Sequence, residues 1–83
     1  MKLKLDLHDI YNRGGEIDRA LRAIIDEAVA KKAPLVEIIP GKGSGKLRQR
    51  VVAFLDQKHI RKLYLRHENA PGNDGRVLVW FRD

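Results

Sequence analysis

The first eight residues of the chain alternate between apolar and polar. Leucines occupy positions 3, 5 and 7, and polar residues occupy positions 4, 6 and 8. This period of two is typical of a β-strand that buries one face. Because residues two apart share a face, Lys4, Asp6 and His8 should project together from the face opposite the leucines.

The apolar residues that follow recur at helical spacing. From position 16 onward they stand three or four residues apart, at Ile17, Leu21, Ile24, Ile25, Ala28 and Val29. Carboxylates at positions 16 and 18 and lysines at positions 31 and 32 suit the dipole of such a helix, and Pro34 ends it. The pattern predicts an amphipathic helix from about residue 16 to residue 32.

The middle of the chain predicts a second strand and a second helix. Residues 35–39 are a short, nearly continuous apolar run, typical of an interior strand. A glycine-rich loop occupies residues 40–45. A second amphipathic helix follows and ends near Lys58, with its apolar positions at Leu47, Val51, Phe54 and Leu55.

The last third of the chain predicts two more strands. Residues 60–66 are expected to form a strand with Leu63 and Leu65 on one face. Residues 68–75 are rich in turn formers, and residues 77–81 form an apolar last strand.

The predicted order is β-α-β-α-β-β, an α/β fold. A strand, a crossover helix and a second strand make a unit whose strands are parallel. Two helices do not cover both faces of four strands, so we expect a two-layer sandwich. Its four-stranded mixed sheet carries both helices on one face and leaves the other face open. At 83 residues, residues 1–83 are expected to be a single domain.

Composition narrows the classes of partner and compartment. A formal net charge of +6 favours polyanionic partners such as nucleic acid. The absence of cysteine excludes disulfides and thiolate zinc sites and favours a reducing compartment. The N-terminus lacks the apolar core of a signal peptide, and no apolar run is long enough to cross a membrane. These features predict a cytoplasmic protein with no membrane partner.

The glycine-rich loop is a candidate phosphate site. Glycines let a backbone approach a phosphate closely, and the helix that follows offers free N–H groups. Four basic residues surround the loop, and the residue pattern is neither a Walker A motif nor a dinucleotide fingerprint. A glycine turn without a ligand is the alternative. The predicted nucleic-acid contacts are Lys4, Gly41, Lys42, Gly43, Ser44, Gly45, Lys46, Arg48, Arg50 and Arg66.

Two further sets of side chains could carry chemistry. Asp6 and His8 on one strand face can serve as a base with its orienting group or as two metal ligands, although by spacing alone a solvated Asp and His are commoner. His59 and His67 have no spacing that indicates a metal site. In the predicted third strand, Tyr64 and Arg66 fall on the open face, where with Trp80 they could stack bases. Core packing is at least as good a reading for Trp80 and Phe81.

Three stretches resemble the Smr (small MutS-related) domain family. Leu5-Asp6-Leu7-His8 resembles the motif that ends the first strand of these domains. Residues 38–48 resemble the second motif, a strand followed by a G-x-G loop and a helix carrying Leu-Arg. Residues 73–81 resemble the glycine-containing turn and apolar last strand. The resemblance spans essentially the whole chain in the right order.

The resemblance implies a sandwich similar to the C-terminal domain of bacterial translation initiation factor three. It also implies nucleic-acid binding and, in many members, cleavage of RNA or nicking of DNA. Asp6, His8, Gly41 and Gly43 match the positions tied to cleavage. Such domains often lie at the C-terminus of longer proteins, so we expect this chain to be part of one.

Two functions of different classes remain open from the sequence. One is an endonuclease in which His8 acts as general acid or base and Asp6 orients it, either without metal on RNA or with Mg²⁺ or Mn²⁺ and a water nucleophile. The other is a non-catalytic module that binds structured RNA, the ribosome or DNA. Asp9 stands where the family usually has glycine, and Pro40 where its second motif often begins with His or Thr. Proline has no side-chain donor and no N–H, which favours the second function.

Overall fold

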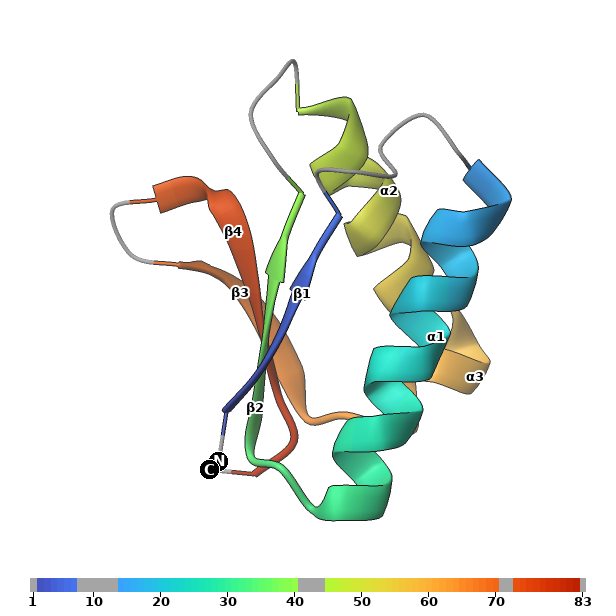
Figure 1. Cartoon of the computed structure of the whole chain (residues 1–83), viewed down its shortest axis with the longest axis vertical. Helices are drawn as coiled ribbons and strands as arrows, with labels where there is room; N and C mark the ends of the chain where they lie inside the picture. The colour runs from blue at the N-terminus through green and yellow to red at the C-terminus, as the bar shows by residue number, and fades with distance from the viewer. Residues whose placement is uncertain (1, 8–13, 41–44, 71–72, 83) are drawn as a thin grey trace.

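A four-stranded mixed sheet is covered on one face by helices, and its other face is open (Figure 1). The computed structural model describes residues 2–7, 14–40, 45–70 and 73–82. Its elements are β1 (Lys2–Asp6), α1 (Gly14–Lys31), β2 (Leu35–Ile39), α2 (Lys46–Leu55), α3 (Lys58–Arg61), β3 (Arg66–Ala70) and β4 (Asn73–Trp80). The strand order is β1-β2-β4-β3, with β1 parallel to β2 and the other neighbours antiparallel. The predicted α/β fold class is confirmed.

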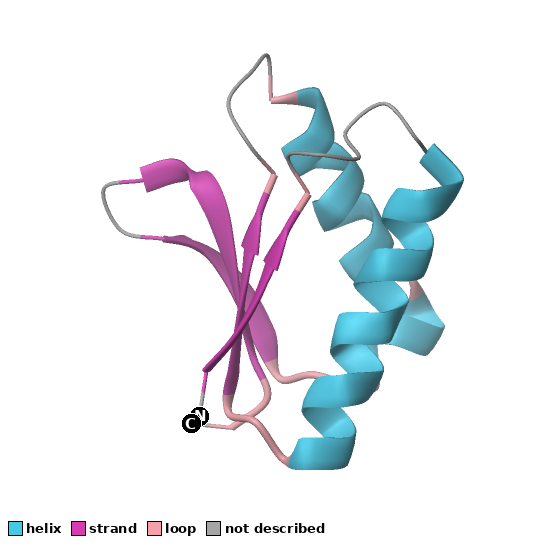
Figure 2. Ribbon diagram, in the orientation of Figure 1, coloured by secondary structure: helices cyan, strands magenta, loops and turns pink. Residues whose placement is uncertain are grey.

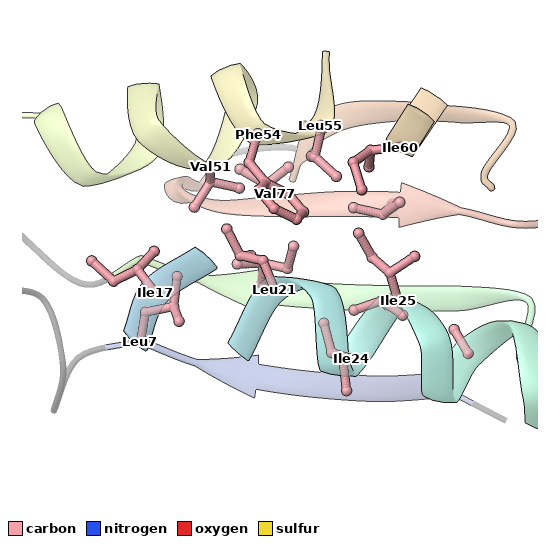
Figure 3. Close-up of a cluster of buried hydrophobic side chains, with 14 of the residues drawn as sticks. Leu7, Ile17, Leu21, Ile24, Ile25, Val51, Phe54, Leu55, Ile60 and Val77 are labelled. Atoms are coloured by element: carbon pink, nitrogen blue, oxygen red, sulfur yellow. The ribbon is translucent and has the colours of Figure 1, made fainter. Parts of the chain in front are cut away.

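The core lies between the sheet and the helices (Figure 3). Its fully buried side chains come from both layers and include Leu7, Val36, Ile38, Val77 and Val79 from the sheet and Leu21, Ile25, Val51, Leu55 and Ile60 from the helices. The alternation predicted for the first strand is present, because Lys4 and Asp6 are exposed while Leu3 and Leu5 pack against the core. Among the described helices, none is long and apolar enough to span a membrane.

The strand predicted over residues 60–66 is wrong. Residues 58–61 form α3 instead, and the strand runs from Arg66 to Ala70. Ile60 is fully buried as part of a helical turn, in which the Leu63 N–H donates to the Ile60 carbonyl at 2.9 Å. Leu65, expected to be buried, is 58% exposed. The apolar spacing of residues 60–65 comes from turns that pack below α2, so the period of two does not apply there.

The turn predicted over residues 68–75 is also wrong at both ends. Residues 68–70 belong to β3 and residues 73–75 to β4. The sequence of β3, Arg-His-Glu-Asn-Ala, has no apolar alternation because β3 is an edge strand whose pairing is with β4 alone. Its backbone is held by cross-strand hydrogen bonds rather than by burial of its side chains. The second helix, predicted to end near Lys58, ends at Leu55.

Lys32 ends α1 in a left-handed conformation. Its φ is 56°, a value that favours glycine. The Ala33 N–H donates to the Ala28 carbonyl at 2.9 Å and the Lys32 N–H to the Val29 carbonyl at 3.3 Å. This pair of bonds is the Schellman arrangement, in which the left-handed position is usually occupied by glycine.

We therefore expect Lys32→Gly to raise the free energy of unfolding by about 0.5–1 kcal/mol. The left-handed region costs a side-chain-bearing residue roughly 1–2 kcal/mol, and the extra backbone entropy of glycine offsets part of that gain. Urea unfolding followed by circular dichroism measures the change. Lys31→Gly, one residue earlier and still helical, is the matched control and should be destabilising by a similar amount. A destabilised Lys32→Gly would contradict the assignment of strain to this residue.

Candidate nucleic-acid interface

The carboxyl ends of β1 and β2 and the amino ends of α1 and α2 lie at the same end of the molecule (Figure 2). Asp6 is paired in register with Ile39, and the Leu7 N–H donates to the Ile39 carbonyl at 2.9 Å. The first motif includes the end of β1 and the second includes the end of β2, so the two motifs meet at neighbouring positions of the sheet. Five of the predicted site residues lie outside the described residues: His8, Gly41, Lys42, Gly43 and Ser44.

Asp6 is exposed at the last position of β1. It lies on the open face of the sheet together with Lys4, because the two residues are separated by Leu5, which packs against the core. The side chain is thus accessible to a large ligand. Leu7, the next residue, is fully buried and fixes the end of the strand against α1.

The start of α2 carries the basic residues predicted to contact phosphate. Gly45 precedes it with φ 85°, and the Gln49 N–H donates to the Gly45 carbonyl at 3.0 Å. Lys46 and Arg50 are exposed, and the first turn contains no carboxylate. Cations at this end of a helix oppose its dipole, and a bound anion would relieve that repulsion.

Two of these basic residues also hold neighbouring elements. The Arg48 guanidinium donates to Asn69 Oδ1 at 2.5 Å, and Arg50 Nε lies 3.6 Å from Asp18 Oδ1. Arg48 borders a groove between α2 and β3 that is also lined by Gln49, Val52, Ala53, Asp56, His67, Glu68 and Asn69. His67 Nε2 is 3.3 Å from Asp56 Oδ1 within it. The groove mixes both signs of charge, so it suits a polyanion less well than the exposed side of α2.

Arg66 is not brought together with the other predicted contacts. In register it faces Trp80, which faces Leu35, which faces Lys2, so it lies at the opposite end of the sheet from Asp6. Arg66 Cζ is 5.0 Å from the Trp80 ring centroid. Glu68 Oε1 accepts from Trp80 Nε1 at 2.9 Å and lies 3.1 Å from Arg66 Nη1. These contacts hold the guanidinium and the indole against each other.

The aromatic residues divide between the two faces. Val77 and Val79 are buried beneath the helices, so Trp80 lies on the open face, whereas Phe81 packs against the core. The expectation that Tyr64 joins Arg66 on the open face is wrong. Tyr64 packs against the core, its hydroxyl donates to the Leu55 carbonyl at 2.6 Å, and burial raises its pKa. The reason is that residue 64 precedes β3, so strand alternation does not place it.

The sequence interpretation missed a buried carboxylate on the open face. Glu37, in the middle of β2, is 5% exposed. Its Oε2 accepts from Arg76 Nη1 at 2.7 Å, and its Oε1 lies 3.3 Å from Lys2 Nζ. The hydrogen bond from Arg76 is the main reason that the pKa of Glu37 is lowered, against the opposing effect of desolvation. A single charged residue inside the apolar run 35–39 was the available signal.

The described residues do not supply a metal site of their own. Within residues 2–7, 14–40, 45–70 and 73–82, no group of three or more histidine or carboxylate side chains could hold a metal ion.

Known proteins are similar to this chain in sequence. A family model described as the Smr domain matches residues 5–82. The chain is 38% identical over 82 residues to a protein named endonuclease MutS2 from Leuconostoc mesenteroides, covering 95% of this chain and 10% of the relative. It is 31% identical over 80 residues to the protein of that name from Streptococcus sanguinis, again covering 95% of this chain and 10% of the relative. The chain thus spans about a tenth of the length of these relatives.

Solved structures agree with the fold. The crystal structure of the Smr domain of Thermus thermophilus MutS2 superposes with a TM-score of 0.73 at 23% identity, covering 99% of this chain and 98% of that one. The stand-alone small MutS-related protein YdaL from Escherichia coli gives 0.71 at 21% identity, covering 96% and 64%. With the family model matching nearly every residue, the chain belongs to the Smr domain family.

Proposed function

We propose that this chain is a nucleic-acid-binding Smr domain that cleaves a phosphodiester backbone at the end of the sheet where β1 and β2 stop. The observation that carries the proposal is the register between Asp6 and Ile39, which sets the two motif segments beside each other. The exposed basic residues at the start of α2 lie at the same end and supply attraction for phosphate. The relatives from Leuconostoc and Streptococcus are named endonucleases, in agreement with this assignment.

In the proposed reaction, His8 acts as the general acid or base, and Asp6 orients or activates the His8 imidazole. On RNA, a 2′-oxygen attacks the adjacent phosphorus as it loses its proton, the bond to the 5′-oxygen breaks, and that oxygen is protonated. The products are a cyclic phosphate and a 5′-hydroxyl. Residues 41–45 and Lys46 hold the phosphate and offset the negative charge that develops on it. RNA is proposed as the preferred substrate over DNA.

A binding module without catalysis is the alternative. Pro40 follows β2 directly, is buried, and has no N–H to donate to a phosphate. With proline at position 40, a basic surface would keep its affinity for RNA, the ribosome or DNA. A site that transfers protons would lose a hydrogen-bond donor. In either case the absence of cysteine fits a reducing compartment, and we propose a cytoplasmic domain that is part of a longer protein.

A cleavage assay separates these functions. End-labelled single-stranded RNA, hairpin RNA and supercoiled plasmid are incubated with Mg²⁺, Mn²⁺ or EDTA, beside an Asp6→Ala/His8→Ala double variant. We expect cleavage that the double variant loses, with the EDTA lanes showing whether a metal is needed and the product ends identifying the attacking group. Absent cleavage, or equal cleavage by the double variant, would overturn the endonuclease, and gel shifts in the same tubes would test the binding module.

A further inference from the structure

The positive charge of the chain is concentrated in one stretch of the helical layer. Residues 46–62, which include α2 and α3, contain six lysine or arginine residues and one carboxylate, Asp56. This stretch therefore carries a net charge of +5 out of the chain's +6. The remaining residues are close to neutral, so the field that attracts polyanions originates mainly here.

The cations in this stretch are less neutralised than those elsewhere. Lys46, Lys58, Arg61 and Lys62 are all exposed, and in the described part of the chain no carboxylate lies within ion-pair distance of them. Several basic residues elsewhere do have such partners, in the pairs Arg22–Asp26, Lys31–Glu27, Arg76–Glu37 and Arg66–Glu68. These four cations are therefore available to contact phosphates.

These cations lie at the two ends of α2. Lys46 begins the helix at the candidate cleavage site, whereas Lys58, Arg61 and Lys62, here called the distal cluster, follow its last residue. Ten helical residues rise about 15 Å, which equals roughly four base pairs of a B-form duplex. Ile60 is fully buried and anchors α3 against the core, so the distal cluster is presented on a fixed element.

The chemistry of this surface selects a backbone over bases. Phe54 is the one aromatic residue in residues 46–62, and it is only 8% exposed. Surfaces that bind single strands add aromatic rings on which unstacked bases lie, and this surface has none to offer. Point charges contact phosphates without reading sequence, which suits a duplex whose bases stay stacked inside.

We propose that the exposed surface of α2 and α3 binds the phosphate backbone of double-helical nucleic acid, with Lys58, Arg61 and Lys62 as contacts remote from the cleavage site. The proposal rests on the proposed function, because it assumes a nucleic-acid ligand, and it adds the class of that ligand. The duplex runs along α2 from the distal cluster toward the candidate site.

Binding is measured by fluorescence anisotropy with labelled duplex DNA, duplex RNA and single-stranded RNA of about 20 nucleotides per strand, over a series of salt concentrations. The Asp6→Ala/His8→Ala background prevents turnover during the titration. The test variant is Lys58→Gln/Arg61→Gln/Lys62→Gln. The matched control, Arg19→Gln/Arg22→Gln/Lys31→Gln, removes the same charge from α1. A charge-conserving variant, Lys58→Arg/Arg61→Lys/Lys62→Arg, reports on charge independently of residue shape.

The test variant should bind duplex roughly 10- to 100-fold more weakly at moderate salt, with the slope of log affinity against log salt reduced by about 2–3. The control and the charge-conserving variant should stay within about threefold of the parent protein. Equal losses in the test variant and the control would overturn the proposal. An equal loss on single-stranded RNA would overturn the assignment to double helices.

Cleavage distinguishes this proposal from the proposed function. With the catalytic pair restored, single-turnover cleavage at saturating protein should be unchanged in the test variant, because the whole of α2, about 15 Å long, lies between the distal cluster and Lys46. If the test variant binds duplex as well as the parent protein and still cleaves, the proposed role of the distal cluster is wrong and the proposed endonuclease function stands. If the parent protein does not cleave but the test variant shows the expected loss of binding, the endonuclease function is wrong and the duplex-binding surface stands.

Discussion

Replacing Leu7 with alanine should lower the free energy of unfolding by about 2–5 kcal/mol, the range for large-to-small changes in a packed core. Leu7 is fully buried, contributes to the cluster beneath α1 and lies between Asp6 and His8 in the chain. A domain of this size has limited stability, so the variant should be partly unfolded near physiological temperature. Thermal and urea unfolding measure the loss.

Leu65→Ala is the matched control, because the same atoms are removed from a side chain that is 58% exposed. It should change the free energy of unfolding by less than about 0.5 kcal/mol. The Leu7 variant should also lose cleavage at temperatures where it is still folded, because Leu7 fixes the strand end that carries Asp6. A Leu7→Ala variant as stable as the Leu65→Ala control would contradict the core described here.

The sequence predicted the elements whose side chains are sorted by burial. β1 and α1 show clear periods because each buries one side in the core, and β2 is a nearly continuous apolar run because it lies between two neighbouring strands. The edge strand β3 could not be found this way, because its side chains are exposed or half-buried and its pairing partner follows it in the chain. The strand predicted over residues 60–66 follows from the two-residue spacing of Leu63 and Leu65, which here belongs to the segment between α3 and β3.

Only the part of the candidate site that belongs to the two sequence motifs could be predicted. The two strand ends that carry them are neighbours, as a parallel pair requires, and this followed from the order of elements. Arg66 could not be placed, because its distance from Asp6 depends on the register of β3 against β4. The distal cluster has no motif, and its separation from carboxylates becomes visible only once α3 is folded against the core.

The two faces of the sheet use charge in different ways. On the open face, Glu37 holds Lys2 of β1 and Arg76 of β4, so one carboxylate links three neighbouring strands. Those two cations serve the sheet. In the helical layer, Lys46, Lys58, Arg61 and Lys62 have no carboxylate partner among the described residues, so their mutual repulsion opposes the fold. We infer that Lys2 and Arg76 stabilise the sheet, whereas these four cations attract the ligand.

Replacing Arg76 with methionine tests the stabilising half of that division. Glu37 would stay buried with Lys2 as its remaining cation, and we expect a loss of about 1–3 kcal/mol at pH 7, less than for a fully buried pair because Arg76 is 40% exposed. Arg66→Met is the matched control. It removes the same group from an exposed pair with Glu68 and should cost less than Arg76→Met does, because solvent screens the exposed pair.

The pH dependence identifies the cause. In the parent protein the pKa of Glu37 lies below its usual value of 4.5, so its contribution is complete above that pH and is lost as the pH falls through the lowered value. In Arg76→Met the main cause of lowering is gone and desolvation favours the protonated acid. The difference between the two proteins should therefore shrink below about pH 4.5. Urea unfolding at several pH values measures the difference in free energy of unfolding between the two proteins. If that difference stays constant with pH, Arg76 acts through packing, and the charge of Glu37 does not hold the three strands together.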